Sequence, residues 1–215
     1  MTRNNFESGL KEIYNDVIGL AAMVENAIIH TFEAIENGDE ERLKFVKNND
    51  EIVNIKEQEL EEKCTDIILT QQPIAKDLRL IISILKMITD FERIGDNAAD
   101  ICELVLEIGT KLDVSRYLSE LTRLTIKALK TSVDAYAMNN VEMAQQLKDM
   151  EFQIDQYFSE VLDEIEALMK EKPELIPYCT RVLFIAKYLE RIGDRATNIA
   201  ECTIYNVTGE VVKLN

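Results

Sequence analysis

The segment ERIGDNAADICE, residues 92–103, occurs again almost unchanged as ERIGDRATNIAE at residues 190–201. When the residue before each copy is included, eight of thirteen positions are identical at a constant spacing of 98. A repeat of this kind in a chain of 215 residues predicts an internal duplication, with two similar halves of about 100 residues each.

Apolar residues recur every three or four positions through most of the chain, which is typical of amphipathic helices. Seven glycines and three prolines are few, and both residues interrupt long helices. The helix-breaking positions are Asn37-Gly38, Pro73, the segment 110–115, Asn139-Asn140 and Lys172-Pro173. They divide the chain into six helices, and no stretch alternates with the period of two that strands require.

The sequence therefore predicts an all-α fold with six long helices. We expect two tandem three-helix bundles related by internal duplication, the first formed by residues 1–109 and the second by residues 110–215. Helices of roughly 30 residues would be about 45 Å long, so the molecule should be elongated. The short tail, residues 210–215, is expected to be frayed.

The net charge of −16, from 24 basic and 40 acidic residues, argues against direct binding to nucleic acid or anionic lipid. No run approaches the 18 or more apolar residues of a membrane-spanning helix, and the N-terminus resembles no signal peptide. Four cysteines without a CxxC pair are interpreted as reduced thiols. These features predict a soluble, cytoplasmic protein that binds cations or basic partner surfaces.

The repeated segment places acidic side chains along one face of a helix. Glu92, Asp96 and Asp100 are spaced four residues apart, so they lie one above another. The second copy has Glu190, Asp194 and Asn198 at the same spacing. Like charges four residues apart destabilise a helix by about 0.2–0.5 kcal/mol per pair. Arg93 and Arg191, three residues before Asp96 and Asp194, can relieve part of this repulsion.

The preceding helix of each half carries a second pair of polar residues that should face the first. Residues equidistant from the turn of an antiparallel hairpin lie opposite each other. A turn at Pro73 pairs Asp50 with Asp96 and Asn54 with Glu92. By the same reasoning, a turn between Lys172 and Pro173 pairs Glu151 with Asp194 and Asp155 with Glu190.

Carboxylates that converge without compensating bases are unfavourable unless a cation lies among them. The predicted metal ligands are Asp50, Glu92, Asp96, Asp100, Glu151, Asp155, Glu190 and Asp194. Oxygen ligands suit Mg, Ca, Mn and Fe, and Zn is compatible with them. The spacing leaves open whether a site holds one ion or a bridged cluster. A solvated acidic face is the alternative interpretation.

Three other residue types in or near these helices have structural interpretations. Gly95 and Gly193 lie in mid-helix and should permit close approach of the neighbouring helix. The only histidine, His30, belongs to no Glu-x-x-His motif of the di-iron proteins and is predicted to be a structural or surface residue. Cys202 continues the second acidic stripe and is interpreted as a packed thiol, with a soft metal ligand as the alternative.

The segments TQQPIAKDLRLIISILKMITDFERIGDNAADI and IAKYLERIGDRATNIAE closely resemble the PhoU family, and the resemblance covers the whole chain. It implies duplicated three-helix bundles in a cytoplasmic, often dimeric protein that is not an enzyme. Such proteins damp both uptake by the high-affinity phosphate ABC transporter and signalling by its sensor histidine kinase. The implied partners are the transporter's ATPase subunit and the kinase, with membrane contact only through them.

The resemblance also implies metal, including multinuclear iron clusters, on the E(D)-x-x-x-D motifs. These motifs coincide with Glu92, Asp96 and Asp100 and with Glu190 and Asp194, while Asp50, Glu151 and Asp155 face them. Iron is the first expectation, followed by zinc, manganese or magnesium. Asn54 and Asn198 depart from the pattern, because each removes one negative charge from its half.

Two further functions are compatible with carboxylate-bound metal. One is a metalloenzyme such as a phosphohydrolase, against which stand the absence of histidine from the acidic set and of P-loop or GxSxG motifs. The other is metal storage or a purely structural metal. Phosphate could also bind through a bound metal ion, since the carboxylates alone would repel it.

Overall fold

The computed structural model describes residues 3–109 and 116–214 and, within these ranges, the side chains from Phe6 onward. It contains eight α-helices and one short 3₁₀ helix, and the described residues form no strand. The elements are α1 (Arg3–Asn37), α2 (Glu40–Asn48), α3 (Asp50–Gln71), α4 (Ala75–Ile108), α5 (Arg116–Met138), α6 (Val141–Gln145), α7 (Leu147–Glu171), η1 (Pro173–Leu175) and α8 (Ile176–Thr208). The all-α prediction is confirmed. The segment 110–115, predicted as the linker between the bundles, lies outside the described residues.

The six predicted helices are present, but the second and fifth are interrupted. The second is divided into α2 and α3 at Asn49, whose side-chain Nδ2 donates to the Phe45 carbonyl at 2.7 Å and so ends α2. The fifth is divided into α6 and α7 at Gln146. These interruptions were not predicted, because asparagine and glutamine are compatible with a helix interior and only the local hydrogen bonding shows the break.

The turns match those predicted from the sequence. Gly38 has a φ of 66°, and Asp39 accepts a hydrogen bond from the Arg42 backbone nitrogen at 3.0 Å as the N-cap of α2. The second half repeats this turn 101 residues later. There Asn139 has a φ of 49°, and Asn140 accepts from the Met143 backbone nitrogen at 3.0 Å.

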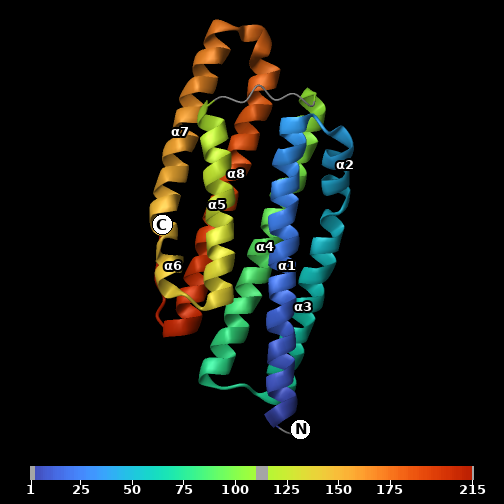
Figure 1. The fold of residues 1–215 in the computed structure, drawn as a ribbon, viewed down its shortest axis with the longest axis vertical. Coiled ribbons are helices and arrows are strands. Elements are labelled where there is room, and N and C mark those ends of the chain that lie inside the picture. Colours follow the sequence, from blue (N-terminus) through green and yellow to red (C-terminus); the bar gives the residue numbers. More distant parts are fainter. Residues whose placement is uncertain (1–2, 110–115, 215) are drawn as a thin grey trace.

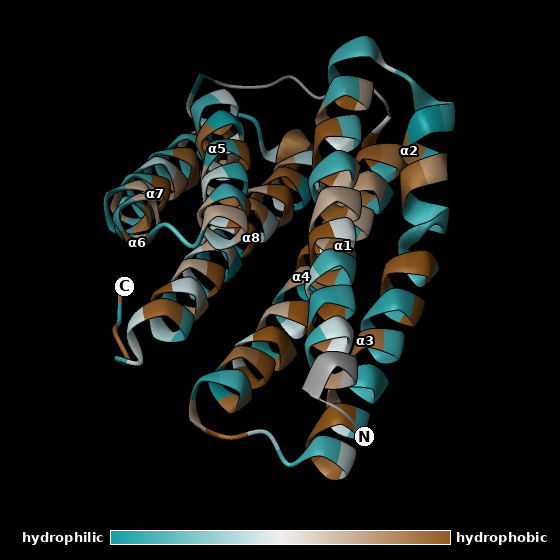
Figure 2. Ribbon diagram, turned by 60° about the horizontal axis from the view of Figure 1, so that its bottom comes forward, coloured by the Kyte–Doolittle hydropathy of each residue, from teal (hydrophilic) through white to brown (hydrophobic). Residues whose placement is uncertain are grey.

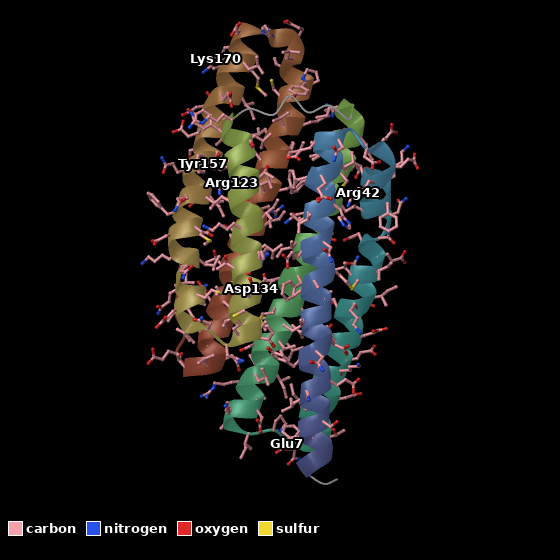
Figure 3. All side chains as sticks on the ribbon, viewed as in Figure 1. Glu7, Arg42, Arg123, Asp134, Tyr157 and Lys170 are labelled. Atoms are coloured by element: carbon pink, nitrogen blue, oxygen red, sulfur yellow. The ribbon has the colours of Figure 1, made fainter. Side chains whose placement is uncertain are left out.

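The two halves lie side by side along the long axis of the molecule, with α4 and α8 adjacent at the centre (Figure 1). These two helices run antiparallel and make the most extensive contact between any two elements. Buried residues of both halves form one continuous hydrophobic core, to which Phe91 of α4 and Leu189 of α8 contribute. Figure 3 shows that Arg42, on α2, and Tyr157, on α7, lie at opposite edges of this elongated arrangement.

Helix α1 is more apolar than expected. By length and hydropathy alone, Phe6–Asn37 could cross a membrane, although the sequence predicts no such run. The helix packs against α2, α3, α4 and α5, and it buries Val17, Leu20 and Val24 completely. The apolar residues of α1 therefore belong to the protein core, and polar residues such as Asp16 lie on the other face of the helix.

The C-terminal tail is ordered as far as Leu214, so the expectation of a frayed tail was wrong for these residues. The Leu214 backbone nitrogen donates to Glu201 Oε1 at 2.9 Å, and Lys213 Nζ pairs with Glu201 Oε2 at 2.9 Å. Leu214 itself is buried against the core. Glu201 thus holds the tail on α8, a long-range contact that has no signal in the local sequence.

Candidate metal centre

In the first half, α3 brings Asp50 and Asn54 against Glu92 and Asp96 of α4; we call these four residues the first acidic cluster. Burial and then the nearby charge of Asp96 raise the pKa of Asp50. The same two causes, in the same order, raise the pKa of Glu92. The predicted pairing of Asp50 with Asp96 is therefore confirmed.

Three oxygen atoms of this cluster are buried without a hydrogen-bond donor among the described residues, namely Asp50 Oδ1, Asn54 Oδ1 and Glu92 Oε2. Only a long contact of 3.5 Å joins Asn54 Nδ2 to Asp50 Oδ2. Arg93 pairs on the outer side, with Nη1 3.3 Å from Asp96 Oδ2 and Nε 3.3 Å from Glu92 Oε2. A buried unsatisfied acceptor costs about 1–3 kcal/mol. The first acidic cluster therefore offers three buried oxygens that a cation would stabilise.

The mid-helix glycines allow the helices of each hairpin to approach closely, as predicted. A Cβ atom added to Gly95 would lie 3.1 Å from Asp50 Oδ1 and 3.2 Å from Val53 Cγ1. A Cβ atom added to Gly193 would lie only 2.7 Å from Ile154 Cδ1. Glycine at these positions lets α3 and α7 carry their acids up to the facing helix.

In the second half, Glu151 and Asp155 of α7 face Glu190 and Asp194 of α8; we call these residues the second acidic cluster. The Glu151 side chain is 6% exposed, and its Oε2 accepts a hydrogen bond from Thr197 Oγ1 at 2.6 Å. Burial, followed by the neighbouring Asp194, raises the pKa of Glu151 to about 7. The predicted pairing of Glu151 with Asp194 is confirmed.

The second acidic cluster also contains a base. Lys187 Nζ lies 2.6 Å from the Glu190 carboxylate and 5.3 Å from the centre of the Phe158 ring. Burial raises the pKa of Glu190, and Lys187 opposes this shift. Burial and then Asp194 raise the pKa of Asp155, and Lys187 again acts in the opposite direction. The second acidic cluster is therefore better compensated than its sequence suggested.

The last residue of each acidic stripe faces the other half of the molecule. Asp100 of α4 lies near Tyr188 of α8, where it adds to burial in raising the pKa of that tyrosine, and its charge also reaches Asp50. In the mirrored position, Asn198 Nδ2 donates to Asp90 Oδ1 at 3.3 Å. Positions 90 and 188, like 100 and 198, are 98 residues apart, so the two contacts are related by the internal duplication.

Asp90 is the buried member of this contact between the halves. It is 7% exposed, and Arg195 Nη1 lies 3.1 Å from its Oδ1. Burial raises the pKa of Asp90, while Asn198 and Arg195 oppose the shift. The departure from a carboxylate at Asn198 therefore has a structural reason, because an amide can donate to Asp90 and a carboxylate would repel it.

Sequence reasoning missed three residues of the two clusters. The charge of Glu57 contributes to the raised pKa of Glu92, and its position seven residues after Asp50 on α3 could have revealed it. Lys187 lies three residues before Glu190, a spacing that could also have been examined. Thr197 gave no signal, because a hydroxyl in an apolar helix face most often bonds to its own backbone.

The fit to a metal ion differs between the clusters. Within residues 3–109 and 116–214, no group of three or more His, Cys, Asp or Glu side chains has a metal-binding arrangement. The acids meet instead as pairs, Asp50 with Asp96 and Glu151 with Asp194. The unpaired oxygens of Asp50 and Asn54 suit a hard cation, whereas Glu151 already has a donor. Metal binding stays a prediction, and the first acidic cluster fits it better.

The structure places the remaining candidates as follows. His30 lines a groove together with Asp50 and Gly95, between α1, α3 and α4. Cys202 is buried, and this burial is the main cause that raises the pKa of its thiol to about 12, as expected of a packed thiol. Arg93 buttresses two carboxylates, whereas Arg191 forms no ion pair within the described part of the chain.

Both the sequence and the fold of the chain are similar to those of known proteins. The family model described as the PhoU domain matches residues 17–105 and residues 118–203. The phosphate-specific transport system accessory protein PhoU homolog of Clostridium acetobutylicum is 35% identical over 218 aligned residues, covering 100% of both chains. The phosphate-specific transport system accessory protein PhoU of Escherichia coli K12 is 35% identical, over 95% of this chain and 86% of that protein.

Two solved structures share the fold over nearly the whole chain. The phosphate transport system regulatory protein PhoU from Streptococcus pneumoniae has a TM-score of 0.89 at 30% identity, covering 97% of this chain and 99% of that one. PhoU from Pseudomonas aeruginosa has a TM-score of 0.90 at 29% identity, covering 95% and 100%. The duplicated acidic motif, the paired three-helix halves and these full-length similarities together establish that the chain belongs to the PhoU family.

Proposed function

We propose that this chain is an accessory regulator of a phosphate-specific transport system. The observation that carries the proposal is similarity along the whole chain, in both halves, to proteins named as accessory proteins of that system. On this proposal the chain acts in the cytoplasm and without catalysis. It lowers phosphate uptake by the high-affinity ABC transporter and phosphate-starvation signalling through the sensor histidine kinase.

The proposed partners are proteins at the inner face of the membrane. The transporter's ATPase subunit and the sensor kinase would bind the surface of this chain directly, and the chain itself would form a homodimer. The net charge of −16 favours partners with basic surfaces and disfavours nucleic acid. Contact with the membrane would occur only through these partners.

The proposal includes metal ions on the acidic clusters. Asp50, Glu92 and Asp96, with the Asn54 carbonyl oxygen and the nearby Asp100, would hold an ion in the first half. Glu151, Asp155, Glu190 and Asp194 would do so in the second. Iron is the first candidate, and zinc, manganese or magnesium are alternatives. A bound cation neutralises converging carboxylates, so it would tie α3 to α4 and make the rigidity of the hairpin depend on metal supply.

The regulatory role can be tested in cells that lack their own copy of this protein. Uptake of radiolabelled phosphate and output of a phosphate-starvation promoter are measured in phosphate-rich medium, with and without this chain. We expect the chain to lower both quantities. Equal uptake and equal promoter output with and without the chain would contradict the proposal.

The same cells separate a regulatory metal from a structural one. A variant carrying Asp50→Asn and Asp96→Asn keeps the shape of both side chains but removes two charges from the first acidic cluster. A folded variant that loses both metal and regulation supports metal-dependent regulation. A folded variant that loses metal and still regulates assigns the ion a structural role.

A further inference from the structure

The internal duplication allows the outer helices of the two halves to be compared position by position. Helices α2 and α3 correspond to α6 and α7 at a spacing of 101, which relates the N-caps Asp39 and Asn140 and the acids Asp50 and Glu151. A difference between the side chains at two corresponding positions therefore identifies a surface feature that belongs to one half only.

Three large apolar side chains are exposed on the first half only. Phe45 is 62% exposed, and Ile52 and Ile55 are each 51% exposed; we call these three residues the apolar face. The corresponding residues of the second half are all exposed glutamines, namely Gln146, Gln153 and Gln156. Contiguous exposed apolar side chains mark interaction sites, because water contact with them is unfavourable unless a partner covers them. In Figure 2, apolar segments alternate with polar ones along α2 and α3.

A groove lies beside the apolar face. It has a volume of about 290 Å³, and Phe45 and Ile52 line it together with Met23 and Ala27 of α1. Val53 forms part of the groove wall, and its counterpart in the second half is the larger Ile154, which packs over Gly193. Gly95, the counterpart of Gly193, remains part of the groove lining. The smaller side chain therefore leaves space in the first half that the second half fills.

The surface that continues from the apolar face along α3 is acidic. Glu51, Glu61 and Glu62 are exposed and form no ion pair within the described residues. The two lysines of α3 do not compensate for them, because Lys56 and Lys63 both pair with Asp16 on α1. An apolar groove with an uncompensated acidic margin is complementary to an apolar stripe flanked by positive charge.

From these observations we infer that the apolar face and its groove bind a basic amphipathic helix of a partner protein. Apolar side chains of that helix would cover Phe45, Ile52 and Ile55, and its lysines or arginines would lie over the glutamates of α3. A second copy of this chain is a poorer occupant of this face, because the acidic margin along α3 would repel another copy with a net charge of −16, and the proposed homodimer would use a different surface. The inference rests on the proposed adaptor role and assigns it a surface.

The binding test uses the full chain and a fluorescent model peptide of about five helical turns, with leucine on one face and lysine on the other. The triple variant Phe45→Gln, Ile52→Gln, Ile55→Gln carries the residues of the second half and leaves the net charge unchanged. We expect its affinity, measured by fluorescence anisotropy, to fall about tenfold or more. The matched control is Phe152→Gln, because Phe152 is 71% exposed on α7 and does not line the groove.

Equal affinity of the triple variant and the unaltered chain would overturn the inference, as would equal binding of a peptide with glutamate in place of lysine. Sedimentation velocity provides an independent outcome. A dimer that the triple substitution converts to monomer would show that a second copy covers the face, and would also overturn it. Circular dichroism verifies that the variants are folded.

Binding to the solubilised phosphate transporter separates this inference from the proposed function. Loss of binding in the triple variant alone supports both. Equal binding by both chains overturns the assigned surface and leaves the regulatory role intact. A chain that binds the leucine–lysine peptide through the apolar face but never the transporter or the kinase supports the surface and contradicts the proposed partners.

Discussion

The two acidic clusters occupy corresponding positions of the duplicated sequence, but the repulsion between their converging carboxylates is compensated to different extents. The first leaves three oxygens buried without a hydrogen-bond donor among the described residues: Asp50 Oδ1, Asn54 Oδ1 and Glu92 Oε2. In the second, Thr197 donates to Glu151, and only Glu190 Oε2 is buried without such a donor, although Lys187 forms an ion pair with that carboxylate. The first half therefore retains more unpaired acceptor oxygens than the second.

Two substitutions between the halves account for most of this difference. Thr197 corresponds to Ala99 at the spacing of 98, so the first acidic cluster has no hydroxyl at that position. Lys187 corresponds in the same way to Thr89, so the first acidic cluster also lacks that base. The comparison teaches that a repeated acidic motif does not by itself define two equivalent metal sites, because neighbouring residues decide how many oxygens remain available.

Metal content should change most. The pair Asp50→Ala and Asp96→Ala should remove most of the iron that the chain retains after loading and desalting, because it disrupts the cluster with more unpaired oxygens. The pair Glu151→Ala and Asp194→Ala should remove less. Elemental analysis measures both, and Glu61→Ala with Glu62→Ala is a control that deletes two exposed acids elsewhere. Equal losses from the two clusters would show that the halves bind metal equivalently.

The next effect is on the pH dependence of stability in the presence of a chelator. Burial and Asp194 raise the folded-state pKa of Glu151 from 4.5 to about 7. The contribution of this group is therefore fully present below pH 4.5 and is lost as the pH rises through about 7. Across that window the wild-type free energy of unfolding should fall by roughly 2–3 kcal/mol relative to Glu151→Gln. Urea titrations at several pH values measure this, and parallel pH profiles would contradict the assignment.

A smaller effect is expected from Thr197→Val, which keeps the side-chain volume and removes the hydroxyl. Glu151 would lose its donor, and the chain at neutral pH should lose about 1–2 kcal/mol of unfolding free energy. Thr203→Val is the matched control, because Thr203 is also fully buried on α8 but donates only to the carbonyl of Ile199 in its own helix. If both variants lose the same free energy, the contact between Thr197 and Glu151 has no special contribution.

The smallest effect concerns the glycines. Gly193→Ala places a Cβ atom 2.7 Å from Ile154 Cδ1 and should cost about 1 kcal/mol, since the gain in helix propensity offsets part of the overpacking. Adding Ile154→Val, the residue found at Val53 in the first half, should recover part of that loss. Chemical unfolding of the single and double variants measures the coupling. Strict additivity would mean that Ile154 does not limit the space at Gly193.

Most of the fold could be predicted from the sequence because its signals are local. Helical periodicity and the breaks at Gly38, Pro73 and Pro173 are properties of neighbouring residues. The pairing of Asp50 with Asp96 and of Glu151 with Asp194 followed from equal distances to the turn, and the structure confirms it. A hairpin of two straight helices has one register, so the turn alone fixes which residues meet.

What could not be predicted depends on contacts between elements that are distant in the sequence. The proximity of Asp100 to Tyr188 and the hydrogen bond from Asn198 to Asp90 depend on how α4 crosses α8. The docking of the tail depends on Glu201, and the difference between the acidic clusters depends on Thr197 and Lys187.

The helices, their turns, the duplication and the acids that face each other can therefore be read from the sequence, because periodicity and chain reversal are encoded locally. Which acids remain unpaired and which face the other half depends on side-chain packing between helices, so these features require the three-dimensional structure.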